Sequence, residues 1–337
     1  TSLGDGDFML YAFPERMAER RNQWFFDLKK EVPAAIYKSS VKEKIRAFRK
    51  IIKENGVDTV HTHFTDMKTD MCVNIACLGL RVKKFKHYRS SFGSFGTIKK
   101  FFARLCYRSW NAVICVSPHT LREAESNIVS CKPVLLNDAV YFPRMDNYEK
   151  LCKPDLGVPE GAVLCFAIGY DYRLKGIDLA CEAVKKLRDE GLNIYLAVCT
   201  ASNTQTIAEQ IRAQFGEFPE WLKLLPPRQD IASYYRAADI YIQASRSEGF
   251  CYAIVEAAYC GKTVVASDCP GMKSHAEKNF DFLWFKNGDS DSLSEKLGQA
   301  VKMSESSELS AKNRRSAIDN YSIENMSKKL HRIYVDM

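Results

Sequence analysis

Two glutamates and a pair of serines follow one predicted strand in the second half of the chain. Residues 240–243 read Ile-Tyr-Ile-Gln, and Ser245 and Ser247 follow shortly after them. We expect one of these serines to cap the following helix, whose first backbone N–H groups then attract an anion. A carboxylate beside a bound phosphate would be repelled, so Glu248 and Glu256 are expected to accept hydrogen bonds from sugar hydroxyls. The pattern predicts a site that binds a phosphate and a sugar together.

A second polar loop follows the predicted strand at residues 163–168. It contains Gly169, Arg173 and Lys175. The two cationic side chains suit an anionic ligand. A solvated helix start is the alternative for Lys175.

Two histidines, His61 and His63, end a predicted strand in the first half of the chain. Side chains alternate along a strand, so both rings lie on the same face. A histidine pair suits a metal, but no third ligand presents itself nearby in the sequence, so we predict no metal site. A purely structural role is the alternative.

These residues lie in a regular alternation of short β-branched runs and longer helical patterns. Val41, Ile45 and Phe48, for example, keep the 3.6-residue period of a helix that we expect at 40–55. The other expected helices cover residues 67–79, 97–110, 118–127, 177–190, 204–215, 231–237 and 250–260. The expected strands cover residues 57–63, 86–90, 112–117, 132–136, 163–168, 193–199, 222–225, 240–243 and 263–266. This alternation predicts an α/β fold with parallel sheets and right-handed crossovers.

The length of 337 residues is too great for one ordinary α/β core and predicts two Rossmann-like domains. We expect an N-terminal domain at 1–142, a polar linker with three prolines at 143–159, and a C-terminal domain at 160–321. A last helix at about 322–337 is expected to pack back on the first domain. Only residues 8–12 suggest an opening strand, so we expect the first β-α unit of the N-terminal domain to be missing.

Composition favours a folded protein of a reducing compartment. Hydrophobic residues make up 46% of the chain and charged residues 27%. The sequence has no apolar run of about 20 residues and no signal peptide pattern at residues 1–7. Twelve cysteines are scattered without a Cys-x-x-Cys pair, which argues against a zinc ribbon and fits the cytoplasm.

The net charge of +8 is concentrated in the first half. Basic residues crowd residues 81–89, and a second group lies on the helix expected at 97–110. In that helix we expect Ile98, Phe101, Phe102 and Leu105 to lie opposite Lys99, Lys100, Arg104 and Arg108. This pattern suits an anionic membrane surface or an anionic substrate, with an ordinary amphipathic helix as the alternative. No aromatic platform accompanies the charge, so a nucleic-acid partner is not expected.

The string from Ser245 to Gly271 resembles the E-x7-E block of the retaining family-four glycosyltransferases, which have the GT-B fold. A bare Glu-x7-Glu is common in proteins, but this chain has a longer ordered string between two strands. The matching pieces are Ser247-Glu248-Gly249-Phe250, Glu256-Ala257, Gly261-Lys262-Thr263-Val264-Val265-Ala266-Ser267-Asp268 and Pro270-Gly271. Residues 168–176 resemble the family's loop that supplies an arginine and a lysine to the donor diphosphate.

The resemblance implies roles for particular residues. It implies catalytic roles for Glu248, Lys175, Arg173 and His63, with His63 a hydrogen-bond partner of the transferred sugar. It implies that the donor is bound by Gly169, Arg228, Gly249, Phe250, Cys251, Tyr252 and Glu256, the last on the ribose. Asn137-Asp138 is similar to the family's Asn-Gly before the linker.

The chain departs from the family pattern at three positions. The family commonly has Gly-Arg where this chain has Gly169-Tyr170, so Arg173 is expected to substitute. Cys251 replaces the usual glycine of Glu-Gly-Phe-Gly, and Ser274 stands where an acidic residue is usual. These departures suggest an unusual donor or acceptor pocket.

The resemblance therefore implies a retaining glycosyltransferase that needs no metal or other cofactor. It would move a hexose or N-acetylhexosamine from a UDP-sugar or GDP-sugar to a glycan or a lipid-linked acceptor. We expect it in bacterial surface-polysaccharide assembly, in the cytoplasm or peripherally on the inner face of the membrane. The alternatives are another GT-B enzyme, such as a sugar-nucleotide epimerase, and a non-catalytic nucleotide-sugar-binding protein.

Overall fold

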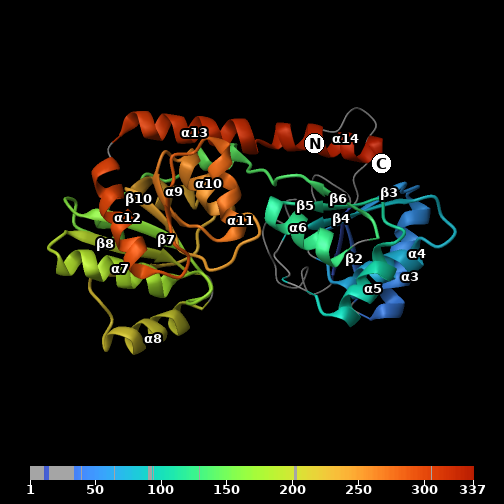
Figure 1. Cartoon of the computed structure of the whole chain (residues 1–337), viewed down its shortest axis with the longest axis horizontal. Helices are drawn as coiled ribbons and strands as arrows, with labels where there is room; N and C mark the ends of the chain where they lie inside the picture. The colour runs from blue at the N-terminus through green and yellow to red at the C-terminus, as the bar shows by residue number, and fades with distance from the viewer. Residues whose placement is uncertain are drawn as a thin grey trace. The chain divides into compact units, whose positions relative to one another are not determined.

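The structure is a computed structural model that describes residues 11–14, 34–38, 40–63, 65–89, 93, 95–128, 130–200, 203–304 and 306–337. The chain forms two compact units (Figure 1). Unit 1 comprises Thr1–Val116, Thr120–Leu136 and Ser327–Met337, and unit 2 comprises Ser117–His119 and Asn137–Met326.

Unit 1 contains a four-stranded parallel sheet in the order β3-β4-β5-β6, and a separate parallel pair, β1-β2. Its strands are β1 (Tyr11–Pro14), β2 (Ala34–Tyr37), β3 (Thr59–His63), β4 (Lys83–Tyr88), β5 (Ala112–Cys115) and β6 (Lys132–Leu135). Its helices are α3 (Val41–Glu54), α4 (Met67–Ala76), α5 (Thr97–Tyr107) and most of α6 (Pro118–Asn127). Strand β5 is buried along its whole length, as expected of an inner strand whose two faces are both covered.

Unit 2 contains a six-stranded parallel sheet in the order β12-β11-β10-β7-β8-β9. Its strands are β7 (Val163–Ile168), β8 (Ile194–Cys199), β9 (Leu222–Leu225), β10 (Ile240–Gln243), β11 (Thr263–Ser267) and β12 (Leu283–Phe285). The chain runs outward from β7 to β9 and then returns to the other side of β7 with β10. The strand order therefore reverses between β7 and β10, as in a dinucleotide-binding fold.

Amphipathic helices cover the sheet of unit 2. They are α7 (Ile177–Asp189), α8 (Thr204–Phe215), α9 (Ala232–Ala237), α10 (Tyr252–Tyr259), α11 (Pro270–Lys273), α12 (Ser290–Met303) and α13 (Ser307–Tyr321). Helix α7 packs beside α12, and α10 packs beside α13 (Figure 1). The buried face of α7, which includes Ile177, Ala180 and Val184, joins the core formed with β7 and β8. Three short 3-10 turns are η1 (Phe142–Met145), η2 (Pro154–Leu156) and η3 (Ser274–Lys278).

The structure describes the expected linker and the expected last helix. Residues 143–159, our expected linker, lie within unit 2 and include η2. The last helix is α14 (Ile323–Asp336), and its residues from Ser327 onward belong to unit 1. There Lys83 Nζ donates to the Tyr334 carbonyl at 2.7 Å. Residues 8–10 of the expected first strand lie outside the described residues, and β1 begins at Tyr11.

Strand β4 begins at Lys83, three residues earlier than expected, and it buries two lysines of the basic cluster at 81–89. Lys84 Nζ donates to Asn74 Oδ1 at 2.8 Å and to Ser109 Oγ at 2.6 Å. Lys86 Nζ pairs with the buried carboxylate of Asp70 at 2.9 Å. These two lysines therefore bind internal polar groups and are not part of a basic surface.

In the part of the chain that the structure describes, every helix is too short or too polar to cross a membrane. All twelve cysteines are free thiols, and most of them are buried.

Candidate active site

Two loops of unit 2 begin at the point where the strand order reverses. One loop follows β7 and carries Lys175, and the other follows β10 and carries Glu248. Strands β7 and β10 are parallel neighbours, so both loops start at the same edge of the sheet. In open α/β sheets this edge, outside the carboxyl ends of the strands, is where ligands bind.

Lys175 and Glu248 form an ion pair at this edge. Lys175 Nζ lies 2.6 Å from Glu248 Oε1, and the two side chains are 15% and 13% exposed. Ser245 Oγ donates to the same carboxylate oxygen at 2.8 Å. Burial alone would lower the pKa of Lys175, but the Glu248 carboxylate outweighs it and raises the pKa. The site thus holds a charged ammonium and an oriented hydrogen-bond acceptor side by side.

Arg246 links the two loops through hydrogen bonds. Its backbone N–H donates to the Leu174 carbonyl at 2.9 Å, directly beside Lys175. Its guanidinium donates to both carboxylate oxygens of Asp178 at 2.8 Å each. Hydrogen bonds that Arg246 donates to Asp178 raise the pKa of Arg246, so this link is charged at any ordinary pH. Our sequence analysis missed Arg246, although its place directly after β10 between the two serines was a usable signal.

Arg173 is not bonded to the Lys175–Glu248 pair. Its guanidinium pairs with Asp178 at 2.7 Å, and its side chain is 74% exposed. Three cationic side chains, Lys175, Arg173 and Arg246, thus stand against the two carboxylates of Glu248 and Asp178.

Two glycines are required by the close approach of neighbouring backbone. A Cβ atom on Gly176, which has a φ of 64°, would lie 2.0 Å from the Ala244 carbonyl oxygen. A Cβ atom on Gly271 would lie 1.8 Å from the Glu248 carbonyl oxygen. Both glycines therefore hold the Glu248 loop in place, which gives a physical reason for Pro270-Gly271 in the quoted string. Gly169 is also crowded, since a Cβ atom there would lie 2.8 Å from Ile177 Cδ1.

The expected serine cap of helix α10 is wrong. The helix begins at Tyr252, its N-cap is Cys251, and no side chain accepts a capping hydrogen bond. Ser245 is instead engaged with Glu248 and with Gln243, whose Nε2 donates to Ser245 Oγ at 2.7 Å. The loop reaches the helix two residues later than the sequence pattern suggested, because Gly249 and Phe250 remain outside it.

Cys251 has the backbone conformation of a glycine. Its φ is 70°, in the left-handed region that glycine enters easily and other residues enter at a cost of about 1–2 kcal/mol. This is the position where the resembling family has glycine. The side chain is buried, and burial first, with the Glu248 carboxylate second, raises the pKa of its thiol well above the usual value.

Glu256 and Tyr252, which the resemblance assigns to the donor, each have partners within unit 2. Tyr235 Oη donates to Glu256 Oε2 at 3.1 Å, and Arg144 pairs with Glu256 Oε1. Tyr252 Oη donates to Asp138. The two glutamates of the motif therefore have separate surroundings, with Glu248 on a lysine and Glu256 on an arginine and a tyrosine.

Arg228 is held in ion pairs near the edge of β9. Its guanidinium donates to Asp230 at 2.8 Å and 3.0 Å and pairs with Glu149. Hydrogen bonds that Arg228 donates to Asp230 and Glu149 raise the pKa of Arg228. The Arg228 guanidinium carbon lies 5.5 Å from the centre of the Tyr234 ring, in a cation–π contact.

A buried histidine that the sequence analysis missed fixes the Phe250 backbone. His275 Nε2 donates to the Phe250 carbonyl at 2.6 Å, and Tyr321 Oη donates to His275 Nδ1 at 2.7 Å. Burial lowers the pKa of His275 to about 4, so the ring is neutral at pH 7. No motif marks this residue, because its partners lie 25 and 46 positions away in the sequence.

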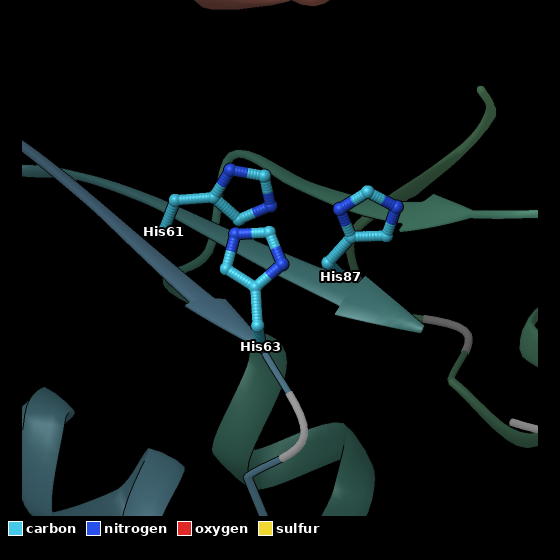
Figure 2. Close-up of side chains that lie close together, drawn as sticks. All are labelled: His61, His63 and His87. Carbon is cyan, nitrogen blue, oxygen red and sulfur yellow. The ribbon is translucent and has the colours of Figure 1, made fainter. Parts of the chain in front are cut away.

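His63 lies in unit 1, where the structure brings three histidine rings together (Figure 2). His61 and His63 lie on one face of β3, as predicted, and His63 is the register partner of His87 on β4. Burial first, and neighbouring positive charges second, lower the pKa of His87 to about 2 and that of His61 well below its usual value. The register of two parallel strands thus supplies the third histidine that the sequence did not reveal.

Comparison with known proteins decides the family. The sequence profile described as Glycosyl transferases group 1 matches residues 151–320, about half of the chain and most of unit 2. The chain belongs to this family. The match includes Lys175, Glu248 and Glu256.

Relatives of known sequence or structure support the same family. The chain is 38% identical over 73 residues to N,N'-diacetylbacillosaminyl-diphospho-undecaprenol alpha-1,3-N-acetylgalactosaminyltransferase of Campylobacter jejuni, which covers 22% of this chain and 19% of the relative. The chain spans less than half the length of several other curated relatives that it matches.

Solved structures show that the fold is GT-B. A glycosyltransferase from Rickettsia africae ESF-5 matches with a TM-score of 0.81 at 17% identity and covers 99% of both chains. Anabaena Alr3699/HepE in complex with UDP and glucose matches with a TM-score of 0.73 at 16% identity, over 94% of this chain and 90% of that one. The expected pair of Rossmann-like domains with parallel sheets is confirmed.

Proposed function

We propose that this protein transfers a hexose or N-acetylhexosamine from a UDP-sugar or GDP-sugar to an acceptor, with retention at the anomeric carbon. The observation that carries the proposal is the Lys175–Glu248 ion pair at the point where the strand order of unit 2 reverses. The Lys175 ammonium suits the diphosphate of a nucleoside-diphosphate sugar, and the Glu248 carboxylate suits its sugar hydroxyls.

The charges describe how a donor would be held. A diphosphate at the sheet edge would attract the Lys175 ammonium, which now rests on Glu248. Once Lys175 turns to the phosphate, Glu248 can accept hydrogen bonds from sugar hydroxyls while Ser245 keeps its carboxylate oriented. Lys175 and Arg173 then stabilise the negative charge that develops on the leaving diphosphate, so no metal ion is needed there.

The remaining donor contacts follow from helix α10 and its surroundings. The first N–H groups of α10, beyond Cys251, lack a side-chain cap and would meet a phosphate. Glu256 would accept hydrogen bonds from the ribose hydroxyls once Arg144 has moved away. The half-exposed Arg144 side chain has room for this movement. We assign the base to the loop at Pro226-Pro227-Arg228, through backbone groups, because the Arg228 side chain is already held by two carboxylates.

The retaining course is part of the proposal. We infer front-face attack by the acceptor hydroxyl, with a departing phosphate oxygen accepting the proton and the anomeric carbon exchanging one C–O bond for another. His63 would then donate a hydrogen bond to the transferred sugar. UDP and glucose bound to a neighbour of the same fold agree with a donor of this class.

We propose a glycan or lipid-linked acceptor at the cytoplasmic face of a membrane. Helix α5 exposes Ile98, Phe101, Phe102 and Leu105, with exposed fractions of 52–76%, while Ala103, Cys106 and Tyr107 face the core. The apolar stripe therefore points away from unit 1, contrary to the ordinary amphipathic helix that was the alternative. Arg104 and Arg108 flank the stripe and are also exposed. An apolar stripe beside cations fits an anionic bilayer, and the Campylobacter relative is named for an acceptor on diphospho-undecaprenol.

The transfer is tested with the full chain, candidate acceptors and a panel of UDP-, GDP- and ADP-sugars. We expect nucleoside diphosphate to be released only in the presence of acceptor, and NMR of the product to show the anomeric configuration of the donor. Glu248→Gln should remove most of this turnover. Isomerised sugar nucleotide, or inversion of the anomeric centre, would contradict the proposal.

The membrane surface is tested by sedimentation with lipid vesicles. The protein should bind vesicles that contain phosphatidylglycerol, bind neutral phosphatidylcholine vesicles less, and release at high salt. Phe101→Ser with Phe102→Ser should weaken binding about tenfold or more without changing the melting temperature, because both rings are exposed. Equal binding of vesicles by the double variant and the wild type would show that α5 is not part of the membrane-binding surface.

A further inference from the structure

Three of the six histidines in the chain lie together at the carboxyl ends of β3 and β4. One ring nitrogen from each of His61, His63 and His87 lies within 4.8 Å of the others. The ring centres are 4.1 Å, 5.2 Å and 5.0 Å apart, and Figure 2 shows the rings from the two strands turned toward one shared space.

The geometry points to a metal site, and we propose that His61, His63 and His87 bind one borderline divalent ion of the zinc class. Nitrogens that share a tetrahedral zinc ion at about 2.0–2.1 Å are separated by about 3.4 Å. The nitrogens must therefore approach by at most about 1.4 Å, which rotation of the exposed His63 ring allows. Imidazole ligands favour Zn²⁺, Ni²⁺, Cu²⁺ or Co²⁺ over Mg²⁺ and Ca²⁺, which prefer oxygen.

Tyr334 of helix α14 supports this assignment. Its hydroxyl shares a hydrogen bond with His61 Nδ1, and the two rings meet edge to face at 5.7 Å. The remaining nitrogen of His61, Nε2, is buried without a hydrogen-bond partner among the described residues. A metal-binding histidine commonly has its outer nitrogen held in this way, which fixes the ring with its inner nitrogen toward the ion.

The three histidines leave one tetrahedral position open. Positive charge from Arg89 reaches all three rings, and it opposes a bare cation. An anionic oxygen, from a carboxylate or a phosphate, would therefore complete the coordination best. Lys86, which lies on the other face of β4 and pairs with Asp70, adds to this positive charge.

This inference does not rest on the proposed transfer reaction. The histidines lie in unit 1, whereas the residues proposed for the diphosphate lie in unit 2. A bound ion would also use only one nitrogen of His63 and leave the other as a hydrogen-bond donor.

The experiment is a binding titration of the full chain after dialysis against a chelator. We expect calorimetry with ZnCl₂ to give one ion per chain with a dissociation constant in the micromolar range or below. Co²⁺ should produce visible absorption bands of a four-coordinate nitrogen site. Zn²⁺ should raise the melting temperature, because it binds only the folded chain at this site.

Variants connect the signal to these rings. His63→Gln should weaken zinc binding at least tenfold, and since His63 is exposed this change should leave the metal-free melting temperature unchanged. His87→Gln should weaken it similarly, and Tyr334→Phe about tenfold. His331→Gln is the matched control, an exposed histidine on the same helix as Tyr334, and should bind like the wild type.

The proposal is overturned if the chelated protein takes up no zinc, or if His63→Gln binds zinc as tightly as the wild type. A loss with His331→Gln equal to that with His63→Gln would also overturn it, because binding would then be adventitious. These outcomes do not depend on glycosyl transfer, so they separate this proposal from the proposed function.

Discussion

The two units present the same kind of sheet edge with opposite chemistry. In unit 2 the carboxyl ends of β7 and β10 carry a charged pair, Lys175 and Glu248, and a second charged group around Asp178. In unit 1 the carboxyl ends of β3 and β4 carry three histidine rings with lowered pKa values. The edge of unit 2 carries side chains of opposite charge, whereas the edge of unit 1 carries neutral imidazole rings.

The difference teaches how each edge is kept stable without its ligand. Charged groups near the end of a sheet need partners, so ion pairs link the loops of unit 2. Neutral imidazoles need no counter-charge, so unit 1 can keep three of them side by side. We therefore expect charge substitutions in unit 2 to change turnover strongly.

The largest effect is expected from removing the cation of unit 2. Lys175→Ala should lower kcat by about 10²–10³-fold, as expected when a group that stabilises transition-state charge is lost. Steady-state kinetics of the transfer reaction measures this. Lys185→Ala is the control, an exposed lysine on α7 that pairs with Asp189, and its kinetics should match the wild type. A loss below tenfold for Lys175→Ala would mean that the charged edge does not serve the leaving group.

The next effect concerns stability at acid pH. The folded pKa of His275 is about 4, below the ordinary unfolded value of about 6.5. As pH falls from 6.5 to 4, the unfolded chain binds a proton that the folded chain refuses, so stability falls by about 3 kcal/mol in total. Hydrogen exchange of peptides from α13, followed at pH 7 and pH 5, should show this loss in the wild type.

His275→Gln provides the comparison for that measurement. It should be less stable at pH 7 by about 1–3 kcal/mol, because the hydrogen bonds to Phe250 and Tyr321 are lost. Its stability should then change less between pH 7 and pH 5 than that of the wild type. An unchanged pH dependence would show that groups other than His275 set the acid sensitivity of unit 2.

A smaller effect is expected from changing Arg246, which links the two loops. Arg246→Lys keeps the charge but loses the two-pronged bond to Asp178, so Lys175 and Glu248 should be held less well. We expect kcat to fall about tenfold while KM changes little. A matching rise in KM with unchanged kcat would instead make Arg246 a donor-binding residue.

The smallest effect is expected at Cys251. Glycine removes the left-handed strain but makes the unfolded chain freer, so Cys251→Gly should change the free energy of unfolding by less than about 1 kcal/mol. Cys251→Ala keeps the strain and should be less stable than the glycine variant by about 1 kcal/mol. Thermal unfolding of the two variants side by side makes the comparison. The reverse order would mean that the thiol packing outweighs the backbone strain.

The sequence predicted the fold where periodicity is strong. The helices at 177–190 and 204–215 were predicted within one residue, because their apolar residues repeat at the spacing of one buried face. The strand at 163–168 was predicted from its continuous apolar run. Strand β4 was misplaced because lysines in a strand suggest a surface, whereas internal partners such as Asn74 and Asp70 make their burial possible.

The candidate site was predicted only in its parts. Lys175 and Glu248 were each singled out by local pattern, but their contact joins residues 73 positions apart and depends on the strand order. Arg246 and His275 were missed because their roles come from bonds to distant backbone, which no local spacing records. The third histidine was missed because it depends on the register between β3 and β4.

Helix α14 has a consequence for how the protein is made. The Tyr334 hydroxyl reaches His61, and Asn111 Nδ2 donates to the carbonyl of Met337 at 2.9 Å. Unit 1 therefore begins early in synthesis but lacks some of its contacts until residues 327–337 leave the ribosome. Unit 2, which is nearly continuous in sequence, has all but three of its residues between 137 and 326. We expect unit 2 to fold from this nearly continuous stretch, whereas unit 1 completes its contacts only once residues 327–337 are available.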